Sequence, residues 1–505
     1  MKWLTRITWI YLALPFILFC MGWLRLSIAV PIVALILWVI YQLIKYVPDS
    51  KTTSHFLLST FYLLLFTALW VFLSGVGGYT FQNWDHHWRN AVLRDLITYN
   101  WPVIYSSPEQ GPIKMLVYYV GYWLPSALVG KVFGWEAANF FLFLWTWLGV
   151  FLVVIHLCKG VVAAPMRTIQ YALLLIFFSG MDALGTILFA KDYPTLWPPI
   201  QHLEIWAGTL QYSSFTTQVF WVFNQAVPAW LCIVLILESD RQEQTPALQI
   251  NSKIFAWSLC FFFAPLASIG LFPYLLIEWL KQMDFKNPFK HIRFDLLFAS
   301  IIVVIISYLF FSSNTAAQER GIQPLALKDF LAFFLLDGGI LWVVLAVVRW
   351  RDPRWMVTGA LLALMPFIQL GSGRDFVMRA SIAPLFYLMI MVGETLFQKN
   401  TNRILLFTFY VLLLFGALTP LYEIDRSVFR TFEYYFVQDK SDCGCDVPSS
   451  EPVTHLAQGV APELEHPNTL VADEIKTLKF MSDKLSKNFI ANVRQSLYYR
   501  YISLR

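Results

Sequence analysis

The chain has 505 residues, of which 58% are hydrophobic and only 14% are charged, and its net charge is +5. Soluble domains carry about 25% charged residues, and a water-exposed surface cannot display so much apolar area without aggregating. These proportions exclude a soluble enzyme, a disordered chain and a nucleic-acid-binding protein. They indicate an integral membrane protein, whose function must be sought in the residues that interrupt the apolar pattern.

A membrane-spanning helix needs about 20 mostly apolar residues. In chain order, runs near that length lie at 7–24, 27–46, 55–76, 136–158, 168–190, 216–238, 294–312, 330–349, 355–371, 381–397 and 404–421. Segment 254–282 is broken by Pro265, Gly270 and Pro273, which predicts two short helices, and segment 113–134 predicts a helix along the interface. We therefore expect an all-α polytopic membrane protein with about 13 transmembrane helices.

Basic residues cluster in alternate connections, and the positive-inside rule assigns those connections to the cytoplasm. The polar loops 77–135 and 191–215 then face the outer side, as does the chain from about residue 422. This pattern predicts a transmembrane domain over 1–421 and a small extracytoplasmic C-terminal region over 422–505. The latter contains Cys443 and Cys445, whose spacing is too short for a two-pair zinc site.

The densest polar cluster lies in the first outer loop, where Asp85, His86, His87 and Arg89 follow a predicted helix. A carboxylate beside imidazoles can act as a general base or bind a divalent cation. We therefore take Asp85, His86 and His87 as candidate catalytic residues. Arg89 and, later in the loop, Glu109 are candidate substrate contacts. The alternative is a solvated turn in which Asp85 caps a helix that begins at His86 or His87.

The second outer loop contains His202 and Glu204, which would share one face of an extended segment. They are candidate substrate contacts, with an ordinary polar loop as the alternative. Asp182 and Asp337 are isolated carboxylates in or near apolar runs, and each is either a proton or ion site or an interfacial residue. Asn224 and Gln225 lie within an apolar run, where buried amides usually bridge helices, with contact to the substrate as the alternative.

A third polar cluster begins at Gly371 and includes Arg374, Asp375 and Arg379. Guanidinium groups beside a glycine turn match phosphate with two parallel hydrogen bonds, so the cluster is a candidate phosphate clamp. The alternative is an Arg374–Asp375 pair or a contact with a lipid headgroup.

The chain resembles the GT-C class of polytopic membrane glycosyltransferases, including bacterial members of that class. The resemblance rests on Asp85 soon after a helix end and on the aromatic stretch from Tyr118 to Pro125, which leads to Gly134. It covers roughly residues 75–240 in its motifs and the whole chain in its architecture. Two features depart from the common pattern: two helices precede the one leading into the loop, and the loop reads Asp-His-His instead of acid-x-acid.

The resemblance implies an inverting enzyme of the bacterial cytoplasmic membrane with its active site facing outside. It would move a sugar from a polyprenyl-phosphate-linked donor to a glycan, lipid or protein acceptor. Asp85 would be the base or a ligand of Mg²⁺ or Mn²⁺, and Arg374 or Arg379 would bind the lipid phosphate. The Asp-His-His sequence leaves open both the metal dependence and the identity of the base.

Two other functions fit the sequence. The broken segment 254–282 together with Asp182 and Asp337 favours a flippase or secondary transporter of a lipid-linked or amphipathic substrate. A polymerase or ligase of surface glycan with a pyrophosphate-linked donor is the third alternative. The sequence has no Walker motif and no dinucleotide fingerprint, which argues against ATP-driven transport by this chain alone.

Overall fold

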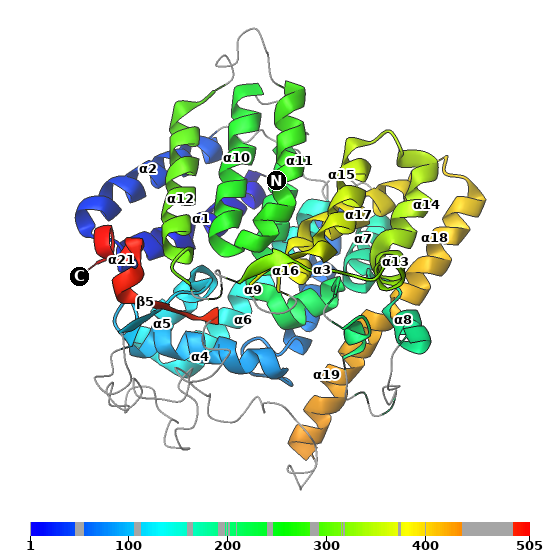
Figure 1. Ribbon diagram of the computed structural model, residues 1–505, viewed down its shortest axis with the longest axis horizontal. Helices are drawn as coiled ribbons and strands as arrows, with labels where there is room; N and C mark the ends of the chain where they lie inside the picture. Colours follow the sequence, from blue (N-terminus) through cyan, green and yellow to red (C-terminus); the bar gives the residue numbers. More distant parts are fainter. Residues whose placement is uncertain are drawn as a thin grey trace.

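The structure is a computed structural model of the chain. It describes residues 2–45, 55–105, 113–158, 165–189, 202–208, 210–239, 246–282, 292–314, 319–371, 375–398, 400–436 and 488–504, with the single residues 197, 199 and 316. These parts are mainly helical (Figure 1). Many of the helices are long, apolar and rich in exposed large hydrophobic side chains, as expected for an integral membrane protein.

Within the described residues, nine helical segments are long and apolar enough to cross a membrane. They are Trp3–Trp23, Leu26–Lys45, Trp135–Cys158, Thr168–Phe189, Phe215–Ser239, Phe294–Phe311, Leu327–Arg349, Asp375–Leu396 and Arg403–Glu433. Thr60–Leu73 and Ala247–Phe263 are shorter apolar helices. The structure thus agrees with the expected class of fold, and the described residues do not confirm the number of 13 crossings.

The helices of the first half are α1 (Lys2–Trp23), α2 (Leu26–Lys45), α3 (His55–Leu73), α4 (Trp84–Thr98), α5 (Leu124–Phe133), α6 (Trp135–Cys158), α7 (Pro165–Phe177), α8 (Asp182–Phe189) and α9 (Phe215–Ser239). The second half contains α10 (Pro246–Phe263), α11 (Pro265–Gln282), α12 (Phe294–Phe311), α13 (Leu327–Phe334), α14 (Ile340–Arg349), α15 (Pro353–Leu364), α16 (Asp375–Ala380), α17 (Ile382–Leu396), α18 (Arg403–Gly416), α19 (Leu418–Phe436) and α21 (Leu497–Tyr501).

Three predicted segments differ in detail. The helices expected from 254–282 are α10 and α11, each of 18 residues, which meet at Ala264 and pack against each other. Segment 355–371 is not one helix: α15 ends at Leu364, and strand β4 follows a turn that contains Pro366. Pro366 has no backbone N–H to donate, so it cannot continue the α-helical hydrogen bonds. Segment 113–134 begins with a strand and ends in the ten-residue helix α5.

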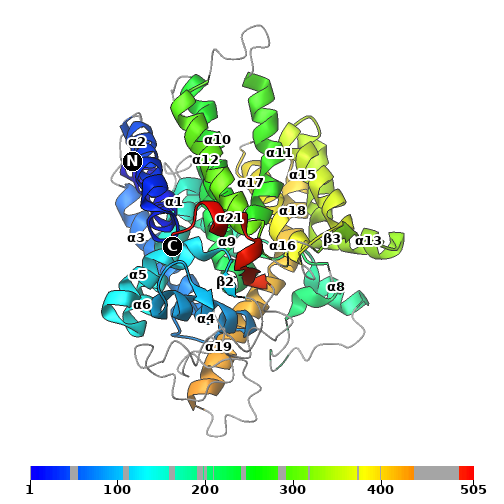
Figure 2. The ribbon, with the colours of Figure 1, turned by 60° about the vertical axis from the view of Figure 1, so that its left-hand side comes forward.

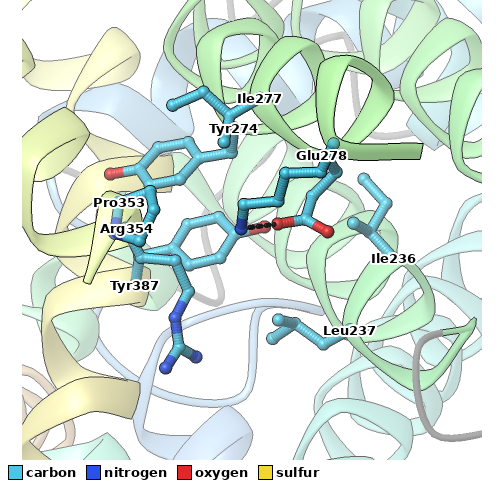
Figure 3. Close-up of a pocket in the computed structure, with 9 residues that line it drawn as sticks. Ile236, Leu237, Tyr274, Ile277, Glu278, Pro353, Arg354 and Tyr387 are labelled. Atoms are coloured by element: carbon cyan, nitrogen blue, oxygen red, sulfur yellow. Dashed lines mark hydrogen bonds and ion pairs between the residues drawn. The ribbon is translucent and has the colours of Figure 1, made fainter. Parts of the chain in front are cut away.

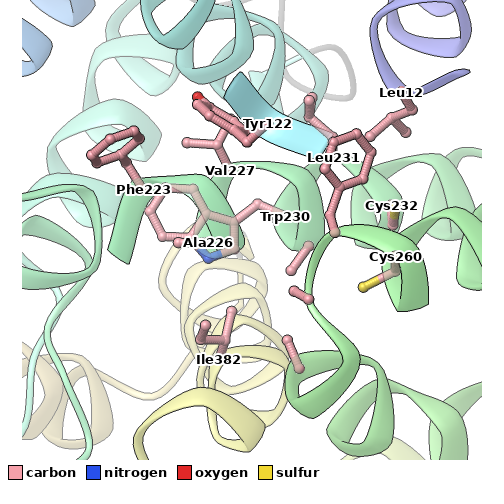
Figure 4. Packing of buried hydrophobic residues seen from close by; sticks show 14 of the residues in the cluster. Leu12, Tyr122, Phe223, Ala226, Val227, Trp230, Leu231, Cys232, Cys260 and Ile382 are labelled. Carbon is pink, nitrogen blue, oxygen red and sulfur yellow. The ribbon is translucent and has the colours of Figure 1, made fainter. Parts of the chain in front are cut away.

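The centre of the molecule is occupied by α9 and α17, the two candidate spans with the largest buried share. Around α9, Tyr122, Phe223 and Trp230 are among the large side chains that interlock with α1, α10 and α17 (Figure 4). A helix that is apolar on all sides is stable when neighbours cover it on all sides. The outer helices α2, α12 and α18 instead expose many apolar side chains, which suits a lipid-facing position.

At one end of the molecule, α4 lies across the direction of α10, α11 and α12, which stand side by side (Figure 1). A three-stranded antiparallel sheet lies at this end, in the order β1 (Ile104–Tyr105), β2 (Lys114–Leu116) and β5 (Ile490–Asn492). A second sheet pairs β3 (Arg320–Ile322) with β4 (Ile368–Leu370). Both sheets join segments that are far apart in the sequence.

The end of the chain packs against its beginning (Figure 2). The Tyr498 hydroxyl donates to the carbonyl oxygen of Trp23 at 2.7 Å, and Leu24 and Ser503 form an isolated antiparallel bridge. The predicted boundary at 421 falls inside α19, which runs without interruption from Leu418 to Phe436. Residues 437–487, including Cys443 and Cys445, lie outside the described part of the chain.

Candidate functional site

A cavity of about 650 Å³ lies where α4 passes the ends of α11 and α12. Its wall also includes residues 117–119 and, near the C-terminus, Asn488 with Phe489. Leu370, Gly371, Asp375, Met378 and Arg379 line it as well. Four of the residues predicted from sequence line this cavity: Asp85, Arg89, Asp375 and Arg379. The structure therefore brings together side chains from the first outer loop and from the cluster near Gly371, which are nearly 300 residues apart in the chain.

Asp85 and Arg89 are held in place by the start of α4. Asn83 caps this helix, because its side chain accepts from the backbone N–H of Asp85 at 3.1 Å. The helix begins at Trp84, so the alternative reading of Asp85 as its cap was wrong. One helical turn separates Asp85 from Arg89, whose Nη2 donates to Asp85 Oδ2 at 2.8 Å. The Arg89 guanidinium also lies over the Phe223 ring of α9, 5.6 Å from its centroid.

A second ion pair faces the same cavity from α16. Asp375 is the first residue of this short helix and Arg379 follows one turn later, so their side chains meet. The backbone before them is fixed by β4 and by Gly371, whose N–H donates to Glu319 O at 2.8 Å. Gly371 has a φ of +82°, a conformation that favours glycine. The charges of Asp85 and Arg89 act on Asp375, so the two pairs form one electrostatic group.

The two arginines retain donors that are not satisfied within the described part of the chain. Nε and Nη1 of Arg89 and Nε of Arg379 are buried and have no hydrogen-bond partner there. Leaving a buried charged donor unsatisfied costs about 1–3 kcal/mol or more. Guanidinium donors of this kind match an anion such as phosphate, which accepts several hydrogen bonds at once. The site is thus chemically suited to bind an anionic group between α4 and α16.

The other residues predicted in the first loop are placed differently. His86 is buried against Phe223, and its Nε2 lies 3.1 Å from the carbonyl oxygen of Phe220. Burial, reinforced by the charge of Arg89, lowers the pKa of His86 to about 3, so the imidazole is neutral near pH 7. It is not among the residues that line the cavity. The side chain of His87 and all of Glu109 lie outside the described residues, as does Arg374.

His202 and Glu204 lie in a different buried cluster, beside α19. His202 Nδ1 is 3.0 Å from Glu423 Oε2, and its Nε2 is 3.5 Å from Glu204 Oε2. Burial disfavours the imidazolium, but the carboxylates of Glu423 and Glu204 outweigh it and raise the pKa of His202 to about 10. Glu423 also accepts from Trp221 at 2.7 Å and from Arg426 at 2.9 Å. This cluster holds α9 to α19 and does not line the cavity.

The residues at Asp85 do not fit a divalent-cation site well. Asp85 is already paired with Arg89, and Asp375 with Arg379, so each carboxylate has a cationic partner. Among the described residues, no group of three or more His, Cys, Asp and Glu is arranged to hold a metal ion. Binding of Mg²⁺ or Mn²⁺ at Asp85 therefore stays a prediction, and the chemistry proposed below uses no cation.

A second, smaller cavity of about 150 Å³ lies toward the other end of α11 (Figure 3). It is lined by Tyr274, Glu278, Lys281, Arg354 and Tyr387, among others. Its charged groups are paired with each other or with close neighbours: Lys281 donates to Glu278 at 2.9 Å, and Arg354 donates to Asp352 and Glu394. Because these donors are used within the protein, the cavity offers less for a ligand than the larger one.

Most of the aromatic residues that line the larger cavity were not predicted from the sequence. Trp84, Trp88 and Phe489 were not selected, and Tyr118 and Tyr119 were cited only for the resemblance. Trp84 and Trp88 have the same one-turn spacing as Asp85 and Arg89, which is a signal that they share a face of α4. No local signal in residues 488–489 indicated that the end of the chain would return to this site.

Comparison with protein-family models, curated proteins and solved structures finds no match for the chain.

Proposed function

We propose that the protein is an inverting membrane glycosyltransferase that moves a sugar from a polyprenyl-phosphate-linked donor to a hydroxyl acceptor. The observation that carries the proposal is the placing of Asp85, Arg89, Asp375 and Arg379 around one cavity. The proposed location is the outer face of the bacterial cytoplasmic membrane, and the acceptor would be a glycan, a lipid or a protein.

In the proposed reaction, Asp85 removes the proton of the acceptor hydroxyl. The oxygen attacks the anomeric carbon from the side opposite the phosphate and forms the new glycosidic bond. The bond between the anomeric carbon and the phosphate oxygen breaks, and its electron pair leaves with the phosphate. Asp85 then releases its proton to water. General-base catalysis of this kind contributes about 10²- to 10⁴-fold to the rate.

Arg89 and Arg379 stabilise the charge that develops on the leaving phosphate. Both arginines line the cavity, and Nε and Nη1 of Arg89 and Nε of Arg379 are buried without a hydrogen-bond partner among the described residues. These nitrogens are the proposed donors to the phosphate, in addition to the existing pairs with Asp85 and Asp375. Preorganised donors in a site with little water are worth much more than in solution, because they need no reorganisation during the reaction.

The remaining wall supports a lipid-linked donor. Pro265, Leu266 and Ile269 of α11 and Met378 of α16 form an aliphatic side of the cavity. Ile269 and Tyr308, at the margin of this side, are 42% and 61% exposed. A polyprenyl chain could therefore leave the cavity between α11 and α12 toward the lipid, while its phosphate stays beside the arginines.

The test is transfer of radiolabelled sugar from a polyprenyl-phosphate hexose to envelope material in membranes that contain the protein. Asp85→Asn preserves the size of the side chain and removes the base, so we expect transfer to fall by about 10² or more. Asp329→Asn is the matched control, since Asp329 is exposed in the first turn of α13 and is not a cavity residue. Equal transfer by the wild type and the Asp85 variant would contradict the assignment.

Transport of a lipid-linked or amphipathic substrate is the second candidate, and one observation favours it. Two apolar segments are interrupted where they meet: α7 and α8 are separated near Gly180, and α13 and α14 near Asp337. Met181 N–H donates to Leu336 O at 2.6 Å across this contact, and Asp182 and Asp337 are both buried there. Interrupted membrane helices with buried carboxylates are frequent in transporters. Loss of substrate flipping in Asp182→Asn, with sugar transfer unaffected, would favour this function.

A further inference from the structure

Six aromatic side chains of the larger cavity form a continuous row of ring contacts. In order, they are Trp84, Trp88, Phe489, Tyr118, Tyr119 and Phe311. Phe489 is the central link, since its ring stacks on Trp88 at 5.4 Å and contacts Tyr118 at 4.6 Å. We call these six residues the aromatic wall.

Phe489 is held in the wall by backbone pairing with the first loop. Its carbonyl oxygen accepts from Val117 N–H at 2.8 Å, and β5, which begins at the next residue, pairs with β2. Asn314, after α12, joins the same point, because its Nδ2 donates to Val117 O at 2.7 Å and to Asn488 O at 3.0 Å. The position of the Phe489 ring is therefore set by three separate parts of the chain.

The wall lines the same cavity as the charged groups of the site and the aliphatic residues of α11 and α16. Trp84 and Trp88 alternate with Asp85 and Arg89 along one turn of α4. Burial raises the pKa of Tyr118 although the nearby Arg379 and Arg89 charges oppose it, so its phenol stays neutral. Burial likewise raises the pKa of Tyr119, again against the charge of Arg379. The wall thus combines aromatic faces with neutral hydroxyl groups, next to the predicted phosphate position.

We propose that the aromatic wall is the binding site for the sugar of the donor, with Phe489 from the C-terminal segment as its central specificity-determining residue. This inference rests on the proposed function and names the group that the wall recognises. The C–H face of an uncharged hexose matches an aromatic surface, whereas a polyprenyl chain is matched by the aliphatic side. In the proposed pose the row contacts the sugar ring while the phosphate lies beside Arg89 and Arg379, which line the same cavity.

The test compares two probes on the full chain in detergent: a short-chain polyprenyl phosphate and the same molecule carrying a neutral hexose. Phe489→Leu keeps an apolar side chain in the packing but removes the ring face. We expect this variant to bind the sugar-bearing probe about three- to tenfold more weakly than the wild type. Its affinity for the sugar-free probe should not change, and Phe489→Tyr should restore binding of the sugar-bearing probe.

Tyr501→Ala is the control, since Tyr501 is a 61% exposed aromatic residue of the same segment and is not a cavity residue. It should bind both probes as the wild type does. If Phe489→Leu weakens the binding of both probes equally, or the binding of neither probe, the sugar-site inference is overturned and the proposed function still stands. A wild type that binds neither probe would overturn both. Thermal unfolding of each variant separates loss of binding from loss of fold.

Discussion

The two ion pairs of the cavity are built from the same local element, an acid and an arginine one helical turn apart. In each pair the acid and the arginine neutralise each other's charge, which lowers the free-energy cost of burying four charges beside apolar side chains. The pairs are Asp85–Arg89 and Asp375–Arg379. The arginine is the more buried member of each pair, and part of its guanidinium has no hydrogen-bond partner among the described residues. This arrangement predicts that phosphate binding depends on the planar geometry of the guanidinium group as well as on its positive charge.

Arg379→Lys tests the role of geometry. Lysine keeps the positive charge beside Asp375 but lacks the planar fork that donates two parallel hydrogen bonds to phosphate. We expect about tenfold weaker binding of a sugar-free polyprenyl phosphate, measured by calorimetry on the detergent-solubilised protein. Arg320→Lys, at an exposed position of β3, should bind as the wild type does. Unaltered affinity in the Arg379 variant would show that the guanidinium does not bind the phosphate.

The buried His202 predicts a pH-dependent stability. Its folded-state pKa of about 10 lies above the ordinary value of 6.5, so the folded state retains a proton that the unfolded chain releases. The resulting stabilisation is complete below about pH 6.5 and is lost as the pH rises toward 10. His202→Gln leaves Glu423 and Glu204 without the imidazolium and should lower stability by about 3 kcal/mol at pH 7.

Thermal unfolding of the wild type and of His202→Gln between pH 7 and pH 10 measures this effect. The difference in unfolding temperature between the two proteins should become steadily smaller as the pH rises, since the wild type loses the charge that the variant lacks. A difference that stays constant over this range would show that His202 stabilises the fold by packing alone.

At the scale of elements, the position of α16 depends on its close contact with α11. A Cβ atom at Gly270 would lie 2.0 Å from the backbone carbonyl oxygen of Ala380, so the two helices approach as closely as glycine permits. Ala380 follows Arg379 directly, and a displaced α16 would move both Asp375 and Arg379. Gly270→Ala should therefore destabilise the protein by about 1–3 kcal/mol and lower sugar transfer as well.

Gly321→Ala is a suitable control for this prediction, because a Cβ atom there meets nothing within 4 Å. It should leave both thermal unfolding and transfer unchanged. If Gly270→Ala behaves in the same way, the contact between α11 and α16 does not set the geometry of the site.

At the scale of the whole molecule, sequence patterns predicted apolar helices and polar clusters better than they predicted which residues contact each other in the fold. Asp85, Arg89, Asp375 and Arg379 were recognised because charges are rare in such a chain and therefore conspicuous. Their convergence was not predictable, since it depends on the packing of α4, α11 and α16. The pairing of His202 with Glu423 was missed for the same reason, because 221 residues separate them.

Two further differences, at β4 and at Asn224 with Gln225, have separate causes. Strand β4 was hidden inside an apolar run, because its pairing with β3 is a long-range contact that hydropathy cannot report. Asn224 and Gln225 were expected to bridge helices, yet their buried amide atoms have no hydrogen-bond partner among the described residues. Both lie just after Val222, where the backbone of α9 departs from helical geometry. Amphipathic periodicity reports burial, but it does not report such a kink.

The cavity and the paired cluster at Arg354 lie toward opposite ends of α11, so the orientation of the whole molecule decides which one faces outside. The basic connections predict that the Arg354 end is cytoplasmic and that the cavity end, with β5 and α21, is outside.

This orientation can be measured with a membrane-impermeant maleimide that labels single cysteines. The cysteines are introduced at two exposed positions, Gln495→Cys and Arg351→Cys, with Cys443 and Cys445 replaced by serine. The four remaining cysteines, at positions 20, 158, 232 and 260, are buried. Labelling of Gln495→Cys in intact cells, and of Arg351→Cys only after permeabilisation, is the expected result. The reverse pattern would place the cavity in the cytoplasm and require a donor and acceptor from that side.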